Sequence, residues 1–253
     1  MKMNHSVDVK QLKAMKQTLT RFMMAYKFAL DEMSTKINVL KQEFEYVNDY
    51  NPIEHIKTRL KSPESILKKV YRKNGELSLD WIKGNLKDIA GIRVTCSFIS
   101  DIYKLRDMIQ SQKDIKIVEC KDYIENPKSN GYQSLHLIIE IPVFMSDRQE
   151  NVFIELQIRS IAMDFWASLE HKIYYKYNKK VPKQLIDELK EAAVTAAELD
   201  RKMEKLHEEI NYLKLVDDEQ EEANEFEINH VKFPLPDELL KLVTNDKKKL
   251  GHK

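Results

Sequence analysis

Glycine is scarce in this chain. It contributes 5 of the 253 residues, and none of them lies in a G-x-G-x-x-G or G-x-x-x-x-G-K pattern. Such patterns mark the phosphate-binding loops of Rossmann and P-loop proteins, because glycine lets the backbone approach a phosphate closely. The sequence therefore argues against both of those nucleotide-binding folds.

Cysteine is rare in the chain, and long apolar runs and an excess of one charge are absent. Cys96 and Cys120 have no metal-binding spacing, so we expect reduced, buried thiols. No uncharged run approaches the roughly 18 residues that cross a bilayer, and no apolar signal core begins the chain. We expect a cytoplasmic protein without a membrane partner. The 42 Lys and Arg against 41 Asp and Glu give a net charge of +1, so no overall field attracts nucleic acid and an anion must meet a local patch.

Apolar residues at steps of three and four predict two long amphipathic helices. The first covers residues 10–47, and the second begins at Pro182. After it, residues 217–227 hold seven acids and few apolar residues, which predicts a mobile segment. We therefore divide the chain into an N-terminal helical region at 1–50, a core at 51–180, a C-terminal helix at 181–215 and a tail at 216–253.

Between the long helices, short strands and helices alternate. We expect helices at 63–72, 79–86, 102–112 (capped by Ser100 and Asp101) and 160–175, and strands at 88–94, 115–120, 135–141 and 152–158. This order predicts an α/β (α+β) fold with a mixed sheet of about five strands flanked by helices.

Two of these strands each carry one carboxylate among apolar residues. In the strand at 152–158, alternation separates two sets of side chains: Val152, Ile154, Leu156 and Ile158 on one face, and Phe153, Glu155, Gln157 and Arg159 on the other. Asp88 stands at the start of the other strand. It shares a face with Arg93 only if the strand bulges at Gly91 or if Asp88 lies beyond the strand end. Taken alone, Asp88 is better explained as a turn cap and Glu155 as a solvated strand residue; it is their combination with the other polar residues that favours a site.

A cationic face precedes the first of these strands. Ser62 and Pro63 predict a helix start, and Ser65, Lys69 and Arg72 then share one side of the helix. Arg59 and Lys61 stand just upstream. The cations and the free N–H groups of the helix start suit an anion, although such a face is most often merely solvated.

The loop at 122–132 and the strand after it gather further polar groups. These are Lys128, Asn130, Tyr132, Gln133 and His136. Tyrosine can stack on a purine, and lysine and histidine can meet phosphate oxygens; a plain turn is the alternative. The helix at 160–175 adds a polar stripe that includes Asp164 and His171.

Four stretches together resemble one family. They are Arg59-Leu-Lys-Ser-Pro-Glu-Ser65, Asp88-Ile-Ala-Gly-Ile-Arg93, Lys128-Ser-Asn-Gly-Tyr-Gln-Ser-Leu-His136 and Glu155-Leu-Gln-Ile-Arg159. In this order, over residues 50–178, they resemble the motifs of the RelA/SpoT-type alarmone synthetase domain, a nucleotidyltransferase-like fold. The long flanking helices resemble those of small alarmone synthetases of the RelP-like branch.

The resemblance implies an enzyme of the stringent response. Such a GTP/GDP pyrophosphokinase transfers the β,γ-pyrophosphate of ATP to the 3′-hydroxyl of GDP or GTP and releases AMP. By the same resemblance, Asp88 and Glu155 would bind Mg²⁺, and Glu155 would take the proton of the 3′-hydroxyl. ATP would meet Arg59, Lys61, Ser65, Lys69, Arg72 and Arg93. The acceptor nucleotide would meet Lys121, Lys128, Asn130, Tyr132, His136, Gln157, Asp164 and His171.

Some residues depart from the family pattern, and two alternative functions remain. Ser129 and Gln133 replace a common Pro and Arg, which leaves the acceptor preference open, and Asp164 stands where Asn is frequent. The chain has no His-Asp dipeptide, so we expect synthesis without hydrolysis. The resemblance also implies a homotetramer. The alternatives are another Mg-dependent nucleotidyltransferase and a non-catalytic guanine-nucleotide sensor.

Overall fold

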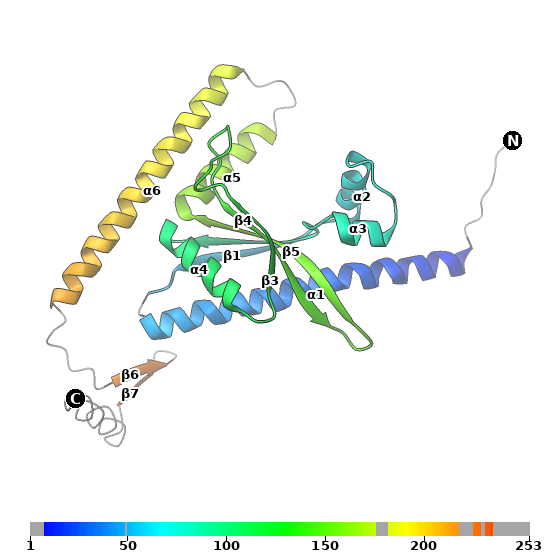
Figure 1. The fold of residues 1–253 in the computed structure, drawn as a ribbon, viewed down its shortest axis with the longest axis horizontal. Coiled ribbons are helices and arrows are strands. Elements are labelled where there is room, and N and C mark those ends of the chain that lie inside the picture. Colours follow the sequence, from blue (N-terminus) through cyan, green and yellow to red (C-terminus); the bar gives the residue numbers. More distant parts are fainter. Residues whose placement is uncertain (1–7, 49, 176–181, 218–224, 229–230, 235–253) are drawn as a thin grey trace, which may run out of the picture.

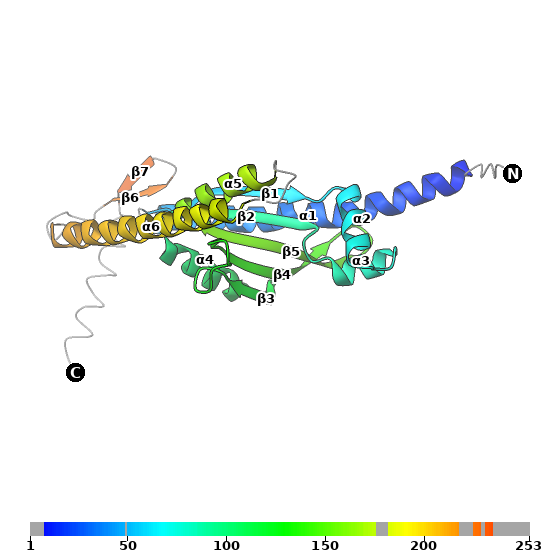
Figure 2. The ribbon, with the colours of Figure 1, turned by 90° about the horizontal axis from the view of Figure 1, so that it is seen from above.

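The protein is built on one mixed sheet of five strands. The computed structural model describes residues 8–48, 50–175, 182–217, 225–228 and 231–234. The strands are β1 (Ile53–Leu60), β2 (Ala90–Cys96), β3 (Lys116–Asp122), β4 (Leu135–Phe144) and β5 (Gln149–Ser160) (Figure 1). Their spatial order is β1-β2-β5-β4-β3 (Figure 2). β2 and β5 run parallel, whereas the other neighbours are antiparallel. The predicted mixed sheet of about five strands is confirmed.

One face of the sheet is covered by helices. Helix α1 (Val9–Asn48) and helix α4 (Ile99–Ser111) bury apolar side chains in a single core with alternate residues of β2, β4 and β5. In β5 these are the four that alternation predicts, Val152 to Ile158. α1 runs along the sheet and extends beyond it toward the N-terminus (Figures 1 and 2), and its residues 9–21 are exposed. The opposite face of β5, with Glu155 and Gln157, is left for polar groups.

The remaining helices lie around the ends of the strands. α2 (Pro63–Arg72) follows β1, and Ser62 caps it by accepting the backbone N–H of Ser65, as predicted. α3 (Leu79–Asn85) leads to β2. α5 (Ile161–Tyr175) begins where β5 ends, and the 35-residue α6 (Lys183–Asp217) packs against it. None of the helices in the described part of the chain has the length and apolar character that crossing a membrane requires.

Several predictions about local structure need correction. α4 starts at Ile99 with Phe98 as its cap, because the Asp101 carboxylate accepts the Phe98 backbone N–H at 3.2 Å from inside the first turn. Cys96 is buried as expected, but Cys120 is exposed, since β3 is an edge strand. The strands β6 (Glu225–Ile228) and β7 (Val231–Pro234) pair as a hairpin. The expected mobile segment thus overlaps β6, while residues 218–224 lie outside the described part.

Gly91 does not form a bulge. β2 pairs with β1 and β5 in unbroken register there, with Gly91 opposite Arg59 on one side and Glu155 on the other. Asp88 lies before the first residue of β2. The second of the two predicted arrangements, with Asp88 beyond the strand end, is therefore the one that the structure adopts.

Candidate active site

Two lysines form ion pairs with Asp88, which lies just before β2. Its Oδ2 atom accepts from Lys61 Nζ at 2.5 Å and also from Lys69 Nζ. Lys61 directly follows β1 and is only 8% exposed, while Lys69 lies one turn before the end of α2. Burial opposes ionisation of Asp88, but the hydrogen bonds and charges of both lysines hold its pKa below the ordinary value. Three of the predicted site residues thus form one ion-paired cluster.

Glu155 lies on the open face of β5, close enough to feel this cluster. Burial raises the pKa of Glu155, and the negative charge of Asp88 raises it further, while Lys69 and Lys61 act in the opposite direction. A carboxylate with a raised pKa is better suited to accept a proton near neutral pH. Glu155 therefore has the properties of a general base, with a second carboxylate nearby.

A cavity of about 230 Å³ lies beside Glu155. Arg59 and Arg93 both line it; Gly91 pairs with Arg59 in the strand register and lies two residues before Arg93 on β2. Its other lining residues are Lys57, Thr58, Ile92, Glu155 and Gln157. Guanidinium groups stack on flat aromatic rings, so the cavity can accept a planar base next to the cluster around Asp88.

The other predicted ATP contacts lie on α2. Ser65 is close to the helix start, where its hydroxyl accepts from the Ser62 hydroxyl at 2.9 Å. Arg72 is the last residue of α2 and is exposed. Lys69 contacts Asp88, and Ser65 lies in the first turn of α2. Arg72 is farther along the same helix.

A second polar cluster surrounds Tyr132. Its hydroxyl lies 2.7 Å from His136 Nε2 and accepts from Arg159 Nη2 at 2.5 Å. Lys128 Nζ lies 4.7 Å from the centre of the Tyr132 ring. Burial lowers the pKa of His136 to about 4, assisted by the positive charges of Arg159, Lys128, Lys121 and Arg93. His136 is therefore neutral at pH 7 and can take part in hydrogen bonds to a bound base.

Arg159 connects the Tyr132 cluster to Asp164, which in turn lies near Arg93 of the cavity, and its role was not predicted. Its guanidinium donates to Tyr132, to Gln157 Oε1 at 3.2 Å and to Asp164 Oδ1 at 3.2 Å. Asp164 also lies 3.4 Å from Arg93 Nη1. Alternation places Arg159 on the polar face of β5, which could have suggested a role. Its partners come from a distant loop and from the next helix, so sequence spacing alone does not reveal them.

Three predicted acceptor residues lie at the margin of this cluster. Lys121 pairs with His136 across β3 and β4, but its ammonium group bonds to Glu119 at 2.7 Å. Asn130 accepts the backbone N–H of Tyr132 at 3.2 Å and so shapes the loop. His171 is exposed on α5, more than one turn beyond Asp164. The structure thus gives Asn130 a structural role in the loop.

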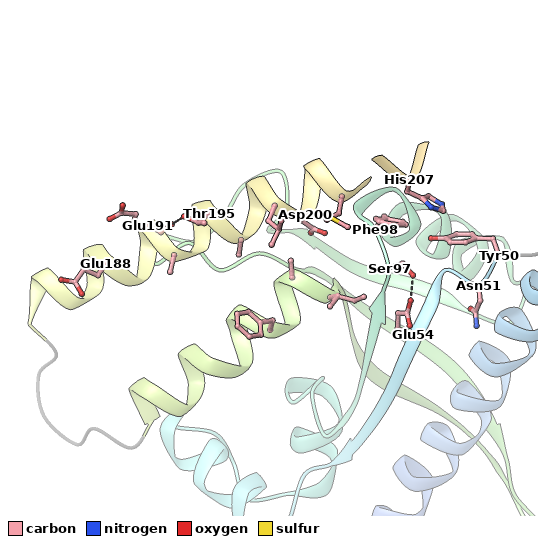
Figure 3. A pocket seen from close by; sticks show the side chains of 17 residues that line it. Tyr50, Asn51, Glu54, Ser97, Phe98, Glu188, Glu191, Thr195, Asp200 and His207 are labelled. Carbon is pink, nitrogen blue, oxygen red and sulfur yellow. Dashed lines mark hydrogen bonds between the residues drawn. The ribbon is translucent and has the colours of Figure 1, made fainter. Parts of the chain in front are cut away.

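A larger groove of about 1140 Å³ runs between α6, α5 and the ends of β1 and β2 (Figure 3). Its lining is mainly apolar, with Phe165, Leu199 and Met203 among the exposed side chains. Its charged lining residues are the acids Glu54, Glu188, Glu191 and Asp200. Because the described residues of this lining include no Lys or Arg, the groove does not suit a nucleoside triphosphate.

The two carboxylates fit a magnesium ion. Mg²⁺ is commonly bound by one or two carboxylates together with waters and substrate phosphates. Asp88 Oδ1 is buried and has no hydrogen-bond partner in the described part of the chain. No group of three or more His, Cys, Asp or Glu is gathered in the described residues. Protein ligands alone would not complete a metal site here, whereas Asp88 and Glu155 with bound phosphates would.

The sheet, the ion-paired cluster around Asp88 and the polar cluster around Tyr132 together define a nucleotide-binding domain for phosphoryl-group chemistry. Comparison with known proteins specifies the family. Residues 58–180 match the family described as "Region found in RelA / SpoT proteins". The chain is 52% identical to GTP pyrophosphokinase YwaC of Bacillus subtilis (strain 168) over 200 residues, which are 79% of this chain and 95% of that protein. The chain belongs to the RelA/SpoT family.

Solved structures agree with this assignment. The crystal structure of small alarmone synthetase 2 from Bacillus subtilis is 53% identical, with a TM-score of 0.69, and the match covers 76% of this chain and 98% of that one. Small alarmone synthetase 1 from the same organism, bound to its product pppGpp, is 35% identical with a TM-score of 0.70. That match covers 77% and 98%. The predicted family and fold are confirmed.

Proposed function

We propose that this protein is a GTP pyrophosphokinase, a small alarmone synthetase that makes guanosine tetra- or pentaphosphate. It transfers the β,γ-pyrophosphate of ATP to the 3′-hydroxyl of GDP or GTP, and AMP leaves. One observation carries the proposal: Glu155 lies on the open sheet face between two groups of side chains. We call them the cationic half (Arg59, Lys61, Lys69 and Arg93) and the aromatic half (Tyr132 and His136). Relatives named as GTP pyrophosphokinases and small alarmone synthetases support it.

In this proposal ATP occupies the cationic half. Its adenine stacks between Arg59 and Arg93 in the 230 Å³ cavity. Its phosphates meet Lys61, Lys69 and the start of α2 with Ser65, and Arg72 adds positive charge farther along the helix. The ammonium groups that bond to Asp88 in this structure exchange that partner for phosphate oxygens.

The acceptor nucleotide occupies the aromatic half. Guanine stacks on Tyr132, with neutral His136 and Gln157 as hydrogen-bond partners. Lys128 and, at the margin, Lys121 attract the acceptor phosphates, while Asn130 shapes the loop. Asp164 orients Arg159 and Arg93, and His171 stays a proposed contact at the outer edge.

The reaction needs positioning and one proton transfer. Glu155 takes the proton of the 3′-hydroxyl as that oxygen attacks the β-phosphorus of ATP and the bond from this phosphorus to the α-phosphate oxygen breaks. Asp88 and Glu155 would hold Mg²⁺, which would neutralise phosphate charge. We propose synthesis without hydrolysis, in the cytoplasm and in the stringent response, with no nucleic-acid partner.

The test is product analysis by anion exchange. Wild type supplied with ATP, GDP and Mg²⁺ should give AMP and guanosine tetraphosphate in equal amounts. Glu155→Gln should lower kcat at least about 1000-fold, because a general base alone contributes roughly 10²–10⁴-fold. Glu140→Gln, the same change on the neighbouring strand β4, serves as the control and should keep its activity.

Other outcomes would contradict the proposal. A product formed only with a different acceptor would indicate another nucleotidyltransferase. Guanine-nucleotide binding in EDTA without any product in Mg²⁺ would indicate a sensor. Equal activity in Glu155→Gln and wild type would remove Glu155 from the mechanism.

The proposal includes assembly as a homotetramer. Exposed apolar side chains follow one stripe of α6, with Leu199, Met203, Leu206, Ile210 and Leu213 each at least 44% exposed. The exposed first turns of α1 add Leu12 and Met15. Large apolar patches on a surface mark association sites, so these two helices supply the contacts between copies.

A further inference from the structure

Helix α6 contacts the aromatic half of the active site at two separate places. At the first, the Ser160 hydroxyl donates a hydrogen bond to Asp200 on α6. Ser160 is fully buried and Asp200 is 5% exposed, although its carboxylate borders the apolar groove (Figure 3). Ser160 ends β5 and directly follows Arg159. α6 is therefore attached to the strand at the residue next to Arg159.

The same serine also starts α5. Its hydroxyl oxygen accepts the backbone N–H of Met163 at 3.2 Å, which is the contact of a helix cap. Burial raises the pKa of Asp200, whereas the hydrogen bond from Ser160 lowers it. Burying a carboxylate costs free energy unless it is hydrogen-bonded, so this bond compensates for the burial. Ser160 thus joins β5, α5 and α6 at one point.

The second place is the loop that carries Tyr132. Gly131 has a φ of +89°, and a Cβ atom there would lie only 2.5 Å from the Cβ of Ala193 on α6. The loop backbone therefore lies directly on α6, and only glycine fits. Tyr132 packs against the cluster of Trp166, Ala167 and Ala193. The position of the Tyr132 ring depends on α6 as well as on its own loop.

These two contacts lie next to the two residues that form one hydrogen bond, Arg159 and Tyr132. Arg159 Nη2 donates to Tyr132 Oη at 2.5 Å. The bond of Asp200 to Ser160 positions the neighbouring Arg159, and the contact of Ala193 with Gly131 positions the neighbouring Tyr132. We propose that Asp200 and Ala193 are positioning residues for the acceptor nucleotide, since together they fix Arg159 relative to Tyr132. The inference rests on the proposed function, because it takes Tyr132 and Arg159 as part of the acceptor site.

The test separates acceptor binding from ATP binding. Asp200→Ala should raise the KM for GDP about tenfold, the effect of one lost hydrogen bond, and change the KM for ATP less than twofold. Asp200→Asn should restore the KM for GDP to within about twofold of wild type, because the amide oxygen still accepts from Ser160. Glu198→Ala, an exposed acid two residues away on α6, is the matched control and should behave as wild type.

A second variant keeps the test valid if Asp200→Ala does not fold. Ala193→Val adds bulk against Gly131 and should also raise the KM for GDP selectively. An equal rise in both KM values, or a lower Tm with an unchanged KM for GDP, would overturn the inference and leave α6 with a purely structural role. An inactive wild type would instead overturn the proposed function, so the two failures are distinguishable.

Discussion

At the scale of single residues, the site depends on groups whose charge is set by their surroundings. Asp88 stays ionised because Lys61 and Lys69 bond to it, and His136 stays neutral because burial and four cations oppose its protonation. Both effects lower the pKa of the group, which keeps the carboxyl charged and the imidazole neutral. Both favour, at neutral pH, the protonation states that the proposed reaction uses.

The lowered pKa of His136 predicts a pH-dependent stability. The unfolded chain takes up this proton near pH 6.5, whereas the folded protein does so only near pH 4. Stability should therefore be lost as the pH falls from 6.5 to 4, by about 3 kcal/mol at most. Chemical denaturation of wild type and His136→Asn across this range should show a smaller loss in the variant. Identical pH dependence in both proteins would contradict the assigned pKa.

At the scale of elements, strand register places the catalytic groups. The parallel pairing of β2 with β5 puts Gly91 opposite Glu155 and Arg93 opposite Gln157. The carboxylate proposed as the base and the arginine proposed to stack on adenine are therefore neighbours on one sheet face. The missing side chain at Gly91 leaves the cavity open between them.

A side chain at Gly91 should block this cavity. A Cβ there would lie 3.8 Å from the Arg59 carbonyl oxygen and 3.9 Å from that of Glu155, which are ordinary contacts, so the fold should tolerate it. Gly91→Val should raise the KM for ATP roughly tenfold, the effect of one lost stacking contact, and leave the KM for GDP nearly unchanged. Gly91→Ala should show a smaller effect in the same direction. A Gly91→Val enzyme with the KM for ATP of wild type would place adenine elsewhere.

The sequence predicts elements better than it predicts contacts between them. Alternation in β5 correctly separated Ile154 and Leu156 from Glu155, because one side of the strand is buried against helices. The cap of α2 at Ser62 followed from local chemistry. The partners of Arg159 were missed, since they lie 5 and 27 residues away and meet only after the sheet has formed. Cys120 was misjudged because β3 occupies an edge.

At the scale of the whole molecule, the exposed stripe of α6 predicts an assembly. Light scattering should give a mass four times that of one chain. Replacing Leu206 and Ile210 together by Lys should lower this mass, because burying two ammonium groups in an apolar contact costs free energy. Lys202→Glu, an exposed change on the same helix, should leave the mass unchanged. A tetramer that survives the double change would exclude this stripe from the contact.

The pairing of Asp88 with Lys61 and Lys69 has a consequence for the order of events in the site. In this structure the ammonium groups of Lys61 and Lys69 neutralise the Asp88 carboxylate. A triphosphate that draws these ammonium groups to itself takes away the counter-ions of Asp88 and leaves its charge uncovered. On the proposed function, binding of the nucleotide would therefore free the carboxylate that Mg²⁺ needs, and the site would be ready for the cation only once there are phosphates for that cation to join.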